Sequence, residues 1–95
     1  MDERQAYLDK MQAQMREWQA KVDEYQAKAD KAQADAKIDY SQKVDDLKTR
    51  MDNVQSKMNE LRDAQDDAWK SIKEGMDNAV SDLKGAFSEA ASKFK

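Results

Sequence analysis

The sequence has no cysteine, histidine or proline, and only two glycines, Gly75 and Gly85. Without cysteine and histidine, the chain lacks disulfides, thiolate nucleophiles and the side chains on which most zinc sites and nucleophile–base pairs depend. Proline and glycine form most tight turns, so their scarcity predicts a chain with few turns. These absences favour long helices and predict a protein that is not an enzyme.

Long apolar runs and a basic excess are missing as well. No stretch reaches ten consecutive apolar residues, which predicts that no helix spans a membrane. The polar start, MDERQ, lacks the apolar core of a signal peptide. Net charge is -3 and the pI is about 5.0, which argues against a nucleic-acid partner. We therefore expect a soluble cytoplasmic protein without a cofactor, a metal or a nucleic-acid partner.

A repeat of seven residues organises the first half of the chain. Residues 5–39 divide into heptads that all begin with Gln-Ala: QAYLDKM, QAQMREW, QAKVDEY, QAKADKA and QADAKID. Their fourth positions are all apolar, and so are the seventh positions of the first four, as at the a and d positions of a coiled coil. After four-residue steps at 36–40–44 and 61–65–69, the apolar spacing from Trp69 onward follows an eleven-residue repeat. Both periods are helical.

The large apolar residues keep a single helical phase along most of the sequence. Strands would alternate with a period of two, which is not observed. We call the following set the apolar stripe and predict that it forms a self-association seam: Leu8, Met11, Met15, Trp18, Val22, Tyr25, Val44, Leu47, Met51, Val54, Met58, Leu61, Trp69, Ile72, Met76, Val80, Leu83, Phe87 and Phe94. Between its halves, Ala29, Ala32 and Ala36 form a thin alanine waist that buries little surface.

This pattern predicts an all-α fold, a long amphipathic helix that forms a coiled coil or a helical bundle. Residues 1–66 are expected to form one heptad-repeat helix. Residues 67–95 form a C-terminal amphipathic helix with the eleven-residue repeat, either continuous with the first helix or hinged to it. Continuity is preferred because the stripe stays in phase, and a bend near 63–67, where Asp63, Asp66 and Asp67 are candidate N-caps, is the alternative.

A single straight helix cannot bury a stripe on itself, so we expect the chain to bind other copies of itself. Within 44–61 the stripe is flanked by basic residues, and in a parallel dimer Lys43 would meet Lys48 of the second copy. An antiparallel or higher-order bundle is therefore favoured. In the alternative, Lys73, Lys84 and Lys95 border the stripe of residues 69–95 and attract an anionic membrane surface.

A resemblance to a known family is carried by two stretches, MQAQMREWQAKVDEYQAKADKAQADAKIDYSQKVDDL and DDAWKSIKEGMDNAVSDLKGAF. They resemble small bacterial coiled-coil proteins classed as a stress-response family of unestablished molecular function. The resemblance implies a cytoplasmic, stress-related coiled coil without catalytic residues. Here Ala64-Gln65 stands where such proteins often have Ser-Gly, which argues against a helix break at that point. The expected function is a non-enzymatic, self-associating structural or scaffold protein. The alternative is a stress-protective amphipathic helix that binds anionic membranes or client proteins.

Overall fold

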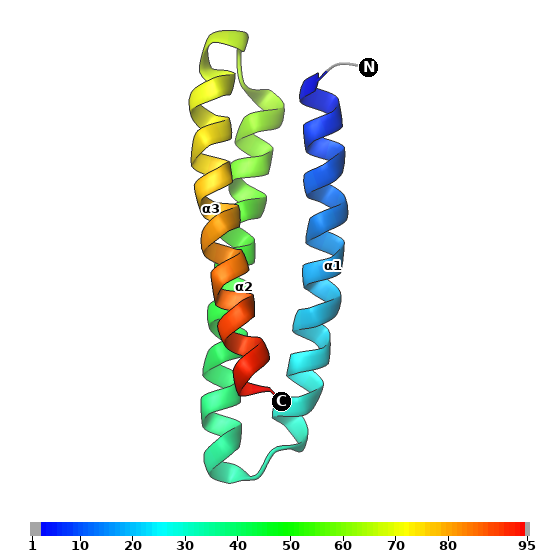
Figure 1. Ribbon diagram of the computed structural model, residues 1–95, viewed down its shortest axis with the longest axis vertical. Helices are drawn as coiled ribbons and strands as arrows, with labels where there is room; N and C mark the ends of the chain where they lie inside the picture. Colours follow the sequence, from blue (N-terminus) through cyan, green and yellow to red (C-terminus); the bar gives the residue numbers. More distant parts are fainter. Residues whose placement is uncertain (1–2, 95) are drawn as a thin grey trace.

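The computed structural model describes residues 3–94, which form three helices and, within that range, no strand. Helix α1 spans Glu3–Lys31, α2 spans Ala34–Asp63 and α3 spans Asp66–Lys93. The helices run up and down the long axis of a bundle that measures 50 × 21 × 18 Å. Helices α1 and α3 both run opposite to α2, and the α2–α3 turn lies at the same end as the start of α1 (Figure 1). The expected all-α fold is confirmed.

The chain reverses at Ala32–Gln33, so the prediction of one helix over residues 1–66 is wrong. Gln33 has φ -70° and ψ 159°, which is extended backbone that any residue can adopt. None of the described residues has a positive φ, so this turn requires no glycine. The reversal allows the stripe residues of α1 and those of α2 to pack against each other. Intramolecular burial thus favours a turn that local helix propensity does not indicate.

The second turn lies at Ala64–Gln65, inside the stretch 63–67 where the sequence placed the alternative bend. The preference for a continuous helix here is wrong, and so is the argument that Ala64-Gln65 opposes a break. Both residues are again extended, with φ near -69°. The N-cap is Gln65, without a capping hydrogen bond from its side chain, rather than any of the three aspartates. Asp66 and Asp67 instead occupy the first turn of α3, where negative charge is favourable.

The core of the bundle consists of the apolar stripe, folded back on itself twice. Sixteen of its nineteen members are buried, whereas Met15, Trp69 and Ile72 are partly buried and pack against the others. Ile38 is the exposed large apolar residue of the described chain, with 61% of its surface accessible. One chain can therefore cover its own stripe. Because the chain turns, burial of the stripe does not by itself require a second copy.

Candidate functional site: the contact between α1 and α3

Helices α1 and α3 meet only through their side chains. Each has close backbone neighbours in α2, but no Cα atom of α1 lies within 8 Å of a Cα atom of α3. Aromatic rings fill the space between them. The Trp18 and Phe87 rings stack with centroids 5.8 Å apart, and Tyr25 stacks on Phe94 at 4.5 Å. Tyr40 of α2 also contacts Phe94, at 4.6 Å. Stripe residues from the two ends of the sequence are thus brought together.

Two basic side chains of α1 bind the carboxyl ends of the other helices. The Arg4 guanidinium donates to the carbonyl oxygens of Leu61, at 2.7 Å, and of Ala64. At the opposite end of the bundle, the Lys28 ammonium donates to the carbonyl oxygen of Phe94, at 3.0 Å. Helix ends leave carbonyl groups without helical partners and carry partial negative charge. Arg4 and Lys28 therefore fasten α1 to the ends of α2 and α3.

A polar cluster surrounds Tyr7, which sequence analysis left outside the stripe. Its ring packs edge-on against Trp69, with centroids 6.2 Å apart, and its hydroxyl donates a hydrogen bond to Asp77. The Lys73 ammonium lies 4.9 Å from the centre of the Tyr7 ring and pairs with Asp77 at 3.2 Å. Burial, followed by the neighbouring Asp77, raises the pKa of Tyr7. The Tyr7 hydrogen bond is the largest cause lowering the pKa of Asp77.

These two pKa shifts predict a stability difference that depends on pH. A lowered carboxyl pKa stabilises the fold above its ordinary value of 3.8, and this contribution is lost as the pH falls through the folded pKa. A raised tyrosine pKa stabilises the fold below its ordinary value of 10.0, and the contribution declines as the pH rises above it. Tyr7→Phe should therefore lower the free energy of unfolding most between about pH 5 and 9. Urea denaturation across the pH range measures this difference, and parallel profiles for both proteins would contradict it.

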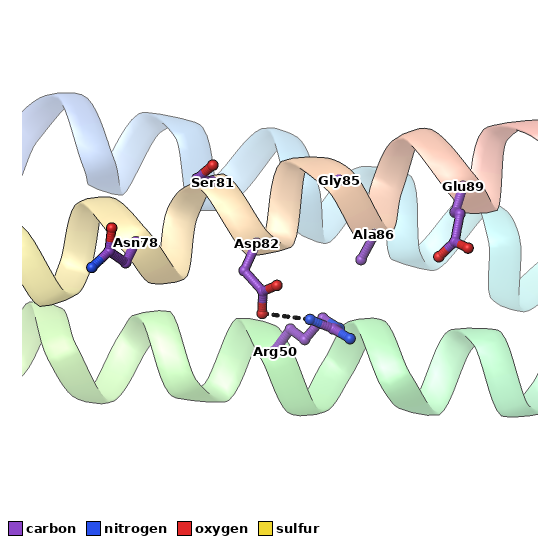
Figure 2. A pocket seen from close by; sticks show the side chains of 7 residues that line it. All are labelled: Arg50, Asn78, Ser81, Asp82, Gly85, Ala86 and Glu89. Carbon is purple, nitrogen blue, oxygen red and sulfur yellow. Dashed lines mark hydrogen bonds and ion pairs between the residues drawn. The ribbon is translucent and has the colours of Figure 1, made fainter.

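The face between α2 and α3 carries ion pairs beside an open groove of about 440 Å³. Arg50 of α2 reaches across to Asp82 of α3, and Gly85 and Glu89 lie further along the same face of α3 (Figure 2). A Cβ atom built on Gly85 would meet nothing within 4 Å. The groove is therefore shallow and solvated. Its ion pairs are exposed, so each adds at most about 1 kcal/mol to stability.

No cluster of side chains suited to metal binding occurs within residues 3–94. Their acidic side chains do not gather into a group of three or more that could hold a metal ion. No helix in this range is long and apolar enough to cross a membrane. The candidate functional features are therefore the stripe, its aromatic contacts and the hydrogen bonds that Arg4 and Lys28 donate to helix ends.

The sequence did not predict the contacts that Arg4, Tyr7, Lys28 and Asp77 make. Each partner lies between 57 and 70 residues away along the chain. The sequence holds no local signal for them, because the contacts arise only when the chain reverses twice. A turn at the alanine waist was the one feature that would have placed α1 beside α2.

Comparison with known proteins gave no relative. No family model matches the chain. Searches of curated proteins and of solved structures likewise found no match.

Proposed function

We propose that this chain is a non-enzymatic structural protein that associates with further copies of itself through the apolar stripe. The observation that carries the proposal is that the stripe keeps its helical phase through both turns. A three-helix bundle requires an apolar face on each helix, but it does not require the faces to stay in phase across the turns. A continuous helix does require its apolar residues to keep one helical phase along its whole length. The in-phase stripe therefore suits a second, more extended arrangement shared between chains.

The surface of the closed bundle limits how such association could occur. Most of the stripe is buried, and Ile38 is the large apolar residue exposed in the described chain, so little of the stripe is open to a partner helix. Association must therefore use the stripe itself, after helices of one chain have separated. A cytoplasmic location and a stress-related, bacterial role belong to the proposal as well. They rest on the resemblance to the stress-response proteins and on the polar composition.

Binding to an anionic membrane through residues 69–95 is less well supported. Lys73 is paired with Asp77 and covers the Tyr7 ring, so it is already engaged in the bundle. Lys95 lies outside the described residues. Helix α3 carries six acidic side chains and four basic ones, which gives it a formal charge of -2. Attraction of this helix to anionic lipid would therefore be weak.

The proposal predicts that the molecular mass rises with protein concentration. Size-exclusion chromatography with light scattering, from low micromolar to millimolar protein, should show monomer giving way to a dimer or larger species. A monomeric mass throughout would refute self-association.

Tryptophan fluorescence separates the membrane alternative from self-association. In a Trp18→Phe variant, only Trp69 reports, and because its ring is partly buried against Tyr7 its emission should change little when anionic vesicles are added. A large, salt-sensitive shift with anionic but not neutral vesicles would favour membrane binding over self-association.

A further inference from the structure

The turn between α1 and α2 is built from residues that favour helix. Ala32 and Gln33 connect stretches rich in alanine, the strongest helix former. Gln33 occupies the N-cap position but makes no capping hydrogen bond through its side chain. The backbone hydrogen bonds at this turn run from Ala32 to Ala29, at 3.2 Å, and from Lys37 to Gln33, at 2.7 Å. Rotation of a few backbone angles would join α1 and α2 into one helix over residues 3–63.

The joined helix would present an unbroken apolar face. At 100° per residue, the stripe from Leu8 to Leu61, continued through the alanine waist and Tyr40, stays within an arc of roughly 120°. Such a helix would be about 90 Å long. In the opened chain, α3 still covers only the part of this apolar face that belongs to α2. The part supplied by α1 would need another chain.

We propose that two copies of this chain exchange α1 by opening at residues 32–33, which rests on the self-association proposed above. In this two-fold dimer, α1 of each copy packs on α2 and α3 of the other. The stacking of Trp18 on Phe87 and of Tyr25 on Phe94 re-forms between copies, as do the Arg4 and Lys28 fastenings. Every α1 contact of the closed bundle is kept, and only the turn changes.

The alanine waist gives the two long helices a place to cross. In the exchanged dimer the joined helices run antiparallel, and residues 32–33 of both copies meet at the two-fold axis. Ala29 is fully buried in the closed bundle, and Ala32 and Ala36 are partly buried. Their small side chains allow two helix backbones to approach closely at the crossing. The waist that buries least within one chain thus becomes the centre of the dimer.

Opening at the α2–α3 turn would lose contacts that opening at residues 32–33 keeps. If α2 and α3 joined at 64–65, the carbonyl groups of Leu61 and Arg62 would bond within the new helix. Arg4, which donates to both in the closed bundle, would lose these acceptors. Exchange at 32–33 leaves the α2–α3 turn and its Arg4 contacts intact. The geometry therefore points to α1 as the exchanged helix.

Matched proline variants test which turn opens. Gln33 and Gln65 have nearly identical backbone angles, with φ of -70° and -69°, so proline suits either closed turn. In the interior of a joined helix, proline removes a hydrogen bond and clashes with the preceding turn. Gln33→Pro should raise the dissociation constant of the dimer at least 1,000-fold, since each dimer would hold two such prolines. Gln65→Pro should leave it within about threefold of the parent protein.

The outcomes separate this inference from the proposed function. If the unmodified chain is monomeric at every concentration, self-association itself is refuted. If it associates and Gln33→Pro associates equally well, self-association stands but exchange at 32–33 is refuted. Loss of the dimer in Gln65→Pro alone would also refute it. Circular dichroism of each variant verifies that the bundle still folds.

A spin-label distance provides a test that does not depend on the proline variants. Gln12 and Asn53 are exposed, and because the native chain has no cysteine, both can be replaced by cysteine and labelled specifically. In the closed bundle they lie at similar heights on neighbouring helices of a molecule 21 Å wide. In the joined helix they would be about 60 Å apart. Doubly labelled chains, diluted into an excess of unlabelled dimer, should show the long distance. A short distance alone in the dimer would overturn the proposal.

Discussion

Replacing Met51 and Met58 together by aspartate is expected to abolish the helical structure at neutral pH. Both side chains are buried in α2, with 6% and 2% of their surface exposed, and α2 contacts both other helices. An unpaired charge in such a position costs several kcal/mol, so two of them approach or exceed the 5–15 kcal/mol that stabilises a typical domain. Far-ultraviolet circular dichroism should show loss of the helical signal even in dilute, monomeric protein.

A matched control uses the exposed apolar residue of the same helix. Ile38→Asp also replaces an apolar side chain by a carboxylate, but at a residue with 61% of its surface accessible. We expect it to alter the free energy of unfolding by less than about 0.5 kcal/mol. If the double variant keeps the melting temperature of the parent, the stripe is not the core of the folded chain.

Replacing Phe87 by alanine should be the most damaging single truncation at the contact between α1 and α3. The Phe87 ring stacks on Trp18 and lies 6.4 Å from Tyr25, and no backbone approach between these helices compensates for its loss. Truncation of a buried phenylalanine costs about 3–5 kcal/mol. Thermal denaturation should show a large drop in melting temperature, and amide hydrogen exchange in α1 should accelerate most.

Phe87→Leu serves as the control, because it keeps most of the apolar volume but removes the aromatic stacking. Its cost should be clearly smaller than that of Phe87→Ala. Equal costs for the two variants would mean that ring stacking, rather than filled volume, holds the helices together. A negligible effect of Phe87→Ala would show that α1 does not rest on α3.

The helical class and the membership of the core followed from the sequence because both depend on local spacing. Residues three and four apart share a face of a helix wherever that helix lies. Val22, Leu47 and Leu83 could therefore be assigned to the apolar stripe, and all three are buried. The same regularity gave no indication of the turn at 32–33, because Ala32 continues the phase of the stripe and both turn residues are good helix formers.

The contacts between helices could not be read from the sequence for a different reason. Arg4 lies among polar residues with no local feature that marks it as a cap for α2. Its role exists only because the chain reverses and brings the start of α1 to the end of α2. Whether a helix former turns or continues depends on the free energy of burying distant surfaces, and no short window of sequence contains that information.

The central position of α2, paired with a neighbour on each side, also shapes how the molecule assembles in time. Both hairpins, α1–α2 and α2–α3, form from segments adjacent in the sequence, so either can nucleate rapidly. The aromatic contacts of α1 with α3 join residues 62 or 69 apart, as in Tyr7 with Trp69 and Trp18 with Phe87. Closing such long loops is entropically costly, so these contacts should form last. Folding chains would then pass through open hairpins whose stripes are exposed. The rate at which α1 closes onto α3 of its own chain, relative to the rate at which two open chains meet, would decide between monomer and dimer.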